Sequence, residues 1–152
     1  MVMSPSIVFF DTEISTDQKR LLDLGAVTES GAIFHGKNLY DFAAFIAQAK
    51  FLCGHNIVEF DLRYLEKAGL SIKAPVIDTL FLSAWLFPKR PYHRLVKDDK
   101  ILSEDLNNPV NDSKKARTVF WESVQAFKAL NPALKRIYHA LLKDHIGYRG
   151  FF

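Results

Sequence analysis

Two carboxylates stand at the end of the first apolar run of the chain. The segment Ser6–Asp11 is rich in β-branched and aromatic residues, which predicts a buried strand, and Glu13 follows two residues later. Residues two apart on a strand point to the same face, so Asp11 and Glu13 can converge on one point. Burying both is costly unless a cation lies between them, and Mg²⁺ prefers oxygen ligands. The pair indicates a metal site, although such pairs are also common on solvated strand ends.

A third acidic residue, Asp61, closes the segment GHNIVEFD at residues 54–61. It lies beside Phe60 on a predicted helix that must pack on the sheet, near the border of the core. In the same segment, Asn56 and Glu59 have the spacing of a capping box, which is a purely structural role. The position of Asp61 is therefore suggestive without being decisive.

A fourth acidic residue, Asp112, heads the apolar stripe of a long predicted helix. It precedes Ala116 by four residues, which places it on the side that faces the core. A role in complementing the helix dipole would explain an acid in the first turn, but not its orientation. The stripe consists of Ala116, Val119, Phe120, Ser123, Val124 and Phe127.

The elements that must position these acids alternate along the chain. Hydrophobic periodicity and turn residues predict strands at 6–11, 21–28, 32–35, 51–54 and 75–77, and helices at about 41–49, 57–68, 78–86, 112–130 and 132–145. Asp41, Asn56 and Asp78 are the expected helix caps. The segment 88–111 has three prolines and no clear period, which predicts a long loop. Three strands followed by alternating helices and strands predict an α/β fold with a mixed sheet.

Together the four acids resemble the motifs of the DEDD superfamily of 3′–5′ exonucleases, the DnaQ-like proofreading type. Asp11 and Glu13 in FDTEIS resemble the first exonuclease motif, and Asp61 in GHNIVEFDLRYL resembles the second. Asp112 in NNPVNDSKKA resembles the third. The resemblance covers about residues 7–127 and implies a ribonuclease H-like fold, with a mixed five-stranded sheet flanked by helices.

The resemblance also implies the chemistry of the site. Members of this superfamily work with two Mg²⁺ or Mn²⁺ ions in two-metal phosphoryl transfer. Asp11 would contact both ions, Glu13 and Asp112 would hold the ion beside the attacking water, and Asp61 would orient the other ion through water. The residues expected to contact the substrate are Ile14, Ser15, Asn56, Phe60, Tyr92, Arg94, Lys97 and Asn107.

The family's general base is absent from both of its usual positions. One branch has His five residues before the last acid, where this chain has Asn107, and another has Tyr four residues before it, where this chain has Asn108. An amide cannot take a proton at neutral pH. His93, in the segment RPYHRL, is the expected substitute as a catalytic residue. Two alternatives stay open: His93 contacts phosphate only, or the metals ionise the water unaided.

Composition and charge narrow the class of protein. The 152 residues and an apolar fraction of 49% predict one domain, residues 1–152, which could be a piece of a longer protein. A single cysteine, Cys53, excludes an intramolecular disulfide and a cysteine-based zinc site. Residues 1–88 carry a net charge of −3 and residues 89–152 one of +6. This asymmetry favours a polyanion along the second half, although a solvated mixed surface is the simpler alternative.

We therefore predict a metal-dependent 3′–5′ exonuclease that acts on single-stranded DNA in repair or proofreading. One alternative is an exonuclease of RNA, which the sequence cannot distinguish. Another is a weakly catalytic binding module that presents nucleic acid to a helicase. The segments RPYHRLVKD and LNNPVND resemble, more weakly, exonuclease modules fused to large RecQ-type helicases. We expect a cytoplasmic protein without a membrane segment.

Overall fold

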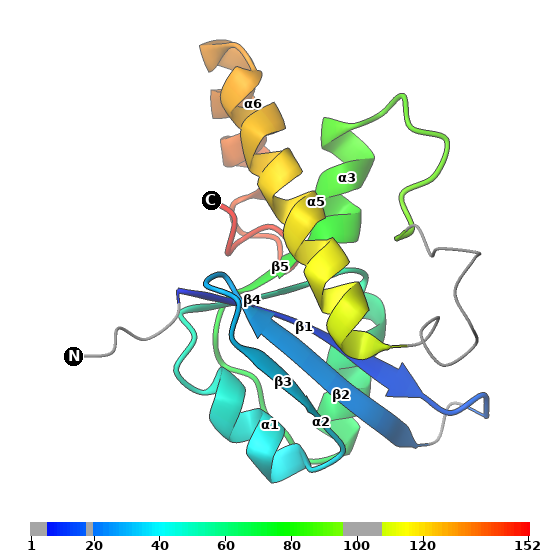
Figure 1. Cartoon of the computed structure of the whole chain (residues 1–152). Helices are drawn as coiled ribbons and strands as arrows, with labels where there is room; N and C mark the ends of the chain where they lie inside the picture. Colours follow the sequence, from blue (N-terminus) through cyan, green and yellow to red (C-terminus); the bar gives the residue numbers. More distant parts are fainter. Residues whose placement is uncertain (1–5, 18–19, 96–107) are drawn as a thin grey trace.

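The computed structural model describes residues 6–17, 20–95 and 108–152, built around one five-stranded sheet (Figure 1). The strands are β1 (Ile7–Ile14), β2 (Leu21–Thr28), β3 (Ile33–Gly36), β4 (Phe51–Gly54) and β5 (Val76–Asp78). Their order is β3-β2-β1-β4-β5. β2 pairs antiparallel with β1 and β3, whereas β4 pairs parallel with β1 and β5. The predicted mixed five-stranded sheet is confirmed.

Helices cover both faces of the sheet. They are α1 (Leu39–Ile46), the π-helical turn η1 (Ile57–Asp61), α2 (Leu62–Lys67), α3 (Thr79–Leu86), α5 (Pro109–Ala129) and α6 (Pro132–Leu142). Neighbouring residues of β1 serve opposite faces, as strand geometry requires. Phe10 packs on Phe42 of α1 at 6.0 Å between ring centroids, and Phe9 packs on Phe120 of α5 at 5.6 Å. Burying each phenyl ring stabilises the fold by about 1.5–3 kcal/mol.

Two predicted helix caps are wrong. Asn38, not Asp41, caps α1: its side chain accepts a hydrogen bond from the Asp41 amide. Asn56 adopts a left-handed conformation, with φ of 60° and ψ of 30°, and makes no side-chain cap. Asparagine tolerates this region better than most residues, so Asn56 serves as a turn residue. Asp78 caps α3 as predicted, accepting from the Leu80 amide.

The longest helix begins earlier than its apolar stripe predicts. Asn108 caps α5 by accepting from the Val110 amide, and Pro109 occupies the first turn, where its missing N–H costs nothing. Asp112 consequently lies within the first turn instead of at its start. Much of the loop expected at 88–111 falls outside the described residues.

The chain after α6 returns to the sheet and covers the outer edge of β5. The Gly147 carbonyl accepts from the Asp78 amide, and the Gly150 amide donates to Val76. An unpaired strand edge exposes backbone groups that can pair with other chains, and this segment satisfies some of them. No helix in the described part of the chain has the length and apolar character needed to cross a membrane.

Candidate metal centre

The site begins where β1 continues beyond its parallel neighbour. β4 pairs with β1 only from Ile7 to Phe9, so the rest of β1 has β2 on one side alone. Asp11 and Glu13 lie on this extension, on the same face as Phe9. Because Phe9 packs against α5, both carboxylates lie on the side of the sheet that α5 covers.

A glycine on β2 allows α5 to approach that part of the sheet closely. Gly25 pairs with Asp11 across the strands. A Cβ atom at Gly25 would lie 2.4 Å from the Val110 amide nitrogen and 2.5 Å from the Pro109 carbonyl carbon. The hydroxyl of Ser113 donates to the Gly25 carbonyl at 3.2 Å, which fastens the first turn of α5 to the strand. The contact places Asp112 over the end of β1.

Three carboxylates converge as a result. Asp11, Glu13 and Asp112 each offer an oxygen, and these oxygens all lie within 4.8 Å of one another. Asp112 is buried and the other two are half-buried. A set of carboxylate oxygens alone is the donor chemistry that Mg²⁺ and Mn²⁺ prefer, so the residues fit such an ion. They line a cavity of about 230 Å³ together with Thr12, Ile14, His55, Asn56, Phe60 and Asp61.

Asp61 lines the same cavity but is tied to the strand backbone. One of its oxygens accepts from the Thr12 amide at 2.9 Å and also from the Thr12 hydroxyl. The Asp61 side chain thus bonds to the edge of β1 beyond the residues that pair with β4. Asp61 is 2% exposed, and this burial raises its pKa to about 7, although the hydrogen bonds from Thr12 oppose the shift.

A buried carboxylate, Asp78, anchors the turn that carries Asp61. Its two oxygens accept from the amides of Asn56 and Val58, at 2.8 and 3.1 Å, at the start of η1. The same side chain caps α3. Burial raises the Asp78 pKa, and the backbone donors oppose that shift. Asp78 was predicted only as a helix cap; its position between apolar residues, in PVIDTLFL, was the available signal of a further role.

The two histidines near the site occupy different positions. His55 lines the cavity, and its Nδ1 lies 2.8 Å from the Thr79 hydroxyl, which itself donates to the Gly54 carbonyl. Burial lowers the His55 pKa to about 4. A hydrogen bond with the backbone of His93 opposes this shift, and the charge of the His93 ring adds to it. His93 is therefore next to His55, with its Nδ1 2.9 Å from Ser83 Oγ. It does not line the cavity of the acids, and its catalytic role stays a prediction.

The comparison with solved structures concerns this fold. No family model and no curated protein matches the sequence. The fold resembles that of NrnC from Brucella melitensis. The match has a TM-score of 0.66 and covers 98% of this chain and 85% of the NrnC chain, at 14% sequence identity. The predicted ribonuclease H-like fold is confirmed by this likeness and by the mixed sheet.

The residues predicted to contact a substrate divide into three groups in this NrnC-like fold. Ile14, Asn56 and Phe60 line the cavity, and Ser15 is buried next to Ile14. Tyr92 is 69% exposed, with the Arg94 guanidinium 5.4 Å from its ring centroid, and neither lines the cavity. Lys97 and Asn107 lie outside the described residues. The role of Gly25 was not predicted, although a glycine inside an apolar strand often marks a close backbone approach.

Proposed function

We propose that this protein is a metal-dependent 3′–5′ exonuclease of the DEDD superfamily that hydrolyses RNA. The observation that carries the proposal is the convergence of Asp11, Glu13 and Asp112 within 4.8 Å, at the end of the central strand of a ribonuclease H-like sheet. Asp61 lines the same cavity, so all four acids that resemble the exonuclease motifs border one space.

The four carboxylates divide into two kinds of ligand. Asp11, Glu13 and Asp112 would hold one divalent ion directly, because their oxygens are already close together. Asp61 would support a second ion shared with Asp11. Bound divalent ions stabilise the charge that develops on the attacking and leaving oxygens of a phosphodiester. The ions also offset the mutual repulsion of the carboxylates and the desolvation of Asp61.

The reaction is the hydrolysis of the last phosphodiester of a strand. Water adds its oxygen to phosphorus, the bond to the 3′ oxygen of the preceding nucleotide breaks, and that oxygen takes a proton. The products are a nucleoside 5′-monophosphate and a strand with a new 3′ hydroxyl. Phe60 and Ile14 border the acids, so they would contact the nucleotide whose phosphate is attacked. Thr12 keeps Asp61 in place through two hydrogen bonds.

The choice of RNA rests on the structural neighbour. This chain shares the fold of NrnC over 98% of its own length. The likeness favours the RNA alternative over the single-stranded DNA that the sequence resemblance first predicted. The recognition of a ribose 2′ hydroxyl would distinguish the two substrates, since DNA lacks that donor and acceptor.

The test is a comparison of short 5′-labelled RNA and DNA strands of one sequence, incubated with the protein and Mn²⁺ or Mg²⁺. We expect stepwise shortening from the 3′ end, faster for RNA, and its loss in EDTA. Asp11→Ala should abolish shortening, whereas Asp41→Ala, an exposed acid on α1, should retain it. Binding without shortening would contradict an enzyme and support the binding-module alternative. Faster shortening of DNA would overturn the RNA assignment alone.

A further inference from the structure

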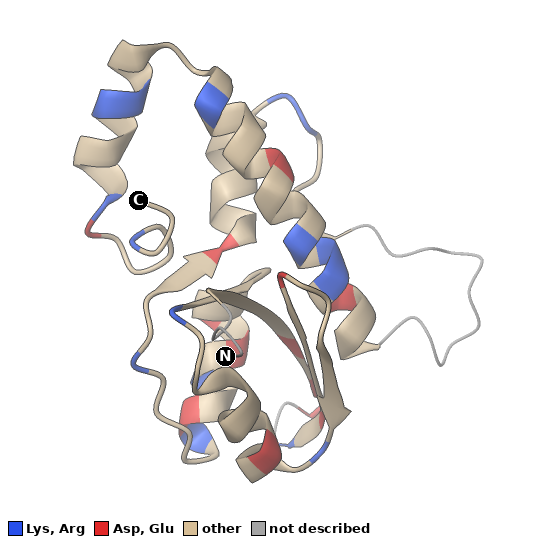
Figure 2. Ribbon diagram, turned by 60° about the vertical axis from the view of Figure 1, so that its left-hand side comes forward, with Lys and Arg blue, Asp and Glu red and all other residues tan. Residues whose placement is uncertain are grey.

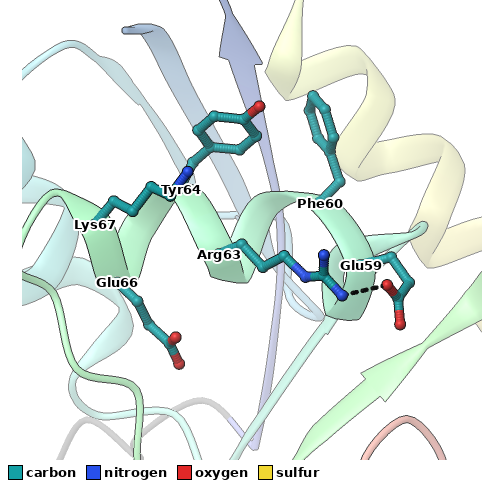
Figure 3. A pocket seen from close by; sticks show the side chains of 6 residues that line it. All are labelled: Glu59, Phe60, Arg63, Tyr64, Glu66 and Lys67. Carbon is teal, nitrogen blue, oxygen red and sulfur yellow. Dashed lines mark hydrogen bonds and ion pairs between the residues drawn. The ribbon is translucent and has the colours of Figure 1, made fainter. Parts of the chain in front are cut away.

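A second hollow lies on the surface of the helical segment that begins with η1 and continues into α2. It has a volume of about 670 Å³ and runs along η1 and α2 (Figure 3). We refer to it as the α2 groove; its lining residues are Glu59, Phe60, Arg63, Tyr64, Glu66 and Lys67. Of these residues, only Phe60 was predicted from the sequence to contact a substrate. Apart from Phe60, its lining residues belong to no site described so far.

Two aromatic rings form one wall of the α2 groove. Phe60 and Tyr64 are one helical turn apart, and Figure 3 shows both projecting from the same side of the helix. Their centroids lie 5.1 Å apart, with an angle of 62° between the ring planes. A planar base inserted between two rings needs a van der Waals separation of about 3.5–4.0 Å on each side. The pair is therefore too close to enclose a base, and a base would stack on the outer surface of one ring.

The charged residues of the groove cancel one another. Glu59 and Glu66 oppose Arg63 and Lys67, and Arg63 is already paired with Glu59 at 2.5 Å. The Lys67 ammonium lies 5.4 Å from the centroid of the Tyr64 ring. A groove without net charge offers little attraction to phosphate, whose binding depends on uncompensated cations. Partly exposed rings in such a groove suit the flat, uncharged surface of a nucleobase.

The α2 groove adjoins the cavity of the acids through a shared residue. Phe60 lines both hollows, and Asp61 follows it directly in the chain. A strand whose last phosphodiester lay at the acids could thus extend past Phe60 towards Tyr64. Ile14, the last residue of β1, lines the acid cavity but not the α2 groove, and we assign it to the terminal nucleotide.

We propose that the α2 groove binds the base of the second-to-last nucleotide, which stacks on Tyr64 beside Phe60. This inference rests on the proposed function, because the acids must hold the scissile phosphate for the groove to receive that base. Stacking accepts any of the four bases, so the groove would provide length dependence without sequence preference. A strand of only two nucleotides would already occupy both hollows.

The experiment measures binding of a fluorescent single-stranded octanucleotide by anisotropy, with Ca²⁺ as the oxygen-binding ion, and scores hydrolysis separately in Mn²⁺. A matched strand lacks the base of its second-to-last nucleotide, and a control strand lacks a base five positions from the 3′ end. We expect Tyr64→Ala and the loss of the second-to-last base each to weaken binding about 5- to 100-fold. Tyr64→Ala should bind the strand without its second-to-last base no more weakly than it binds the intact strand. The unaltered protein should bind the control strand as tightly as the intact strand.

Variants separate stacking from a folding defect. Tyr64→Phe keeps the ring and should bind both strands as the unaltered protein does. Tyr40→Ala removes a tyrosine outside the groove, 89% exposed on α1, and should also have no effect. Equal binding of the intact and base-deficient strands by the unaltered protein would overturn the inference, even if Tyr64→Ala failed to fold. Normal base dependence without hydrolysis would contradict the proposed function but leave the groove as a base-binding site.

Discussion

Burial is the largest influence on the ionisable residues around the acid cavity. It raises the pKa of Asp61 to about 7, raises that of Asp78, and lowers that of His55 to about 4. Each shift favours the uncharged form, as expected when a group leaves water. Hydrogen bonds from Thr12 partly oppose the shift of Asp61, and hydrogen bonds from backbone amides partly oppose that of Asp78. A cation near Asp61 would offset this cost directly, which is why its burial is compatible with a metal centre.

The lowered pKa of His55 predicts how stability depends on pH. Its folded value, about 4, is below the ordinary 6.5, so His55 contributes stability above pH 6.5 that is lost as the pH falls towards 4. In His55→Asn, the amide can still donate to Thr79, but it does not titrate. The free energy of unfolding, measured by urea denaturation, should fall between pH 7.5 and pH 4.5 in both proteins. The fall should be larger in the unaltered protein than in His55→Asn by about 2–3 kcal/mol. An equal loss in both proteins would contradict the shift.

At the scale of elements, the site depends on how closely α5 approaches β2. The Gly25 contact with Val110 and Pro109 leaves no space for a Cβ atom, and the Ser113 hydroxyl holds the same turn to the strand. The η1 turn on the other side is held by Asp78 and by Thr12. Two separate attachments thus bring acids from α5 and η1 to the end of β1.

Gly25→Ala should displace the first turn of α5, because the new methyl carbon would lie 2.4 Å from the Val110 nitrogen. We expect Asp112 to withdraw from Asp11 and Glu13, Mn²⁺ affinity by calorimetry to fall at least tenfold, and stability to fall by about 1–3 kcal/mol. Gly36→Ala on β3 is the control, because its methyl would meet only the Phe34 ring, at 3.4 Å. Unchanged Mn²⁺ affinity in Gly25→Ala would show that this contact does not position Asp112.

Patterns within single elements were predictable from the sequence, and contacts between elements were not. Strand 21–28 and strand 51–54 have the predicted bounds, because each is a short apolar run between turn residues. The cap at Asn56 was wrong because the competing acceptor, Asp78, lies 22 residues away in the chain. The bond between Thr12 and Asp61 spans 49 residues for the same reason. The resemblance to exonuclease motifs selected the acids, but only the fold shows which oxygens meet.

At the scale of the whole molecule, basic residues lie beside the acids of the candidate metal centre, an arrangement that suits the binding of a polyanion there. The chain brings acids from residues 11, 13, 61 and 112 to one end of the sheet. Figure 2 shows Lys and Arg on the first half of α5, close to an acidic segment of the same helix. Lys114, Lys115 and Arg117 are the basic residues there, and Arg117 donates to the Thr28 carbonyl at 3.2 Å. The two lysines remain to attract phosphates of a strand that approaches Asp112.

This arrangement predicts which lysines determine the salt dependence of binding. Each phosphate contact with a single strand contributes about 0.7 to the magnitude of the slope of log affinity against log salt concentration. The reason is that each contact releases condensed counterions from the strand. Replacing Lys114 and Lys115 with Gln should therefore reduce that slope by about 1.4 and weaken binding of RNA in Ca²⁺ at low salt. Replacing Lys135 and Arg136 of α6 with Gln removes the same charge on a helix that carries none of the four acids, and should leave the slope unchanged. Equal slopes for both double variants would show that the strand follows another path, because net charge alone would then explain the salt effect.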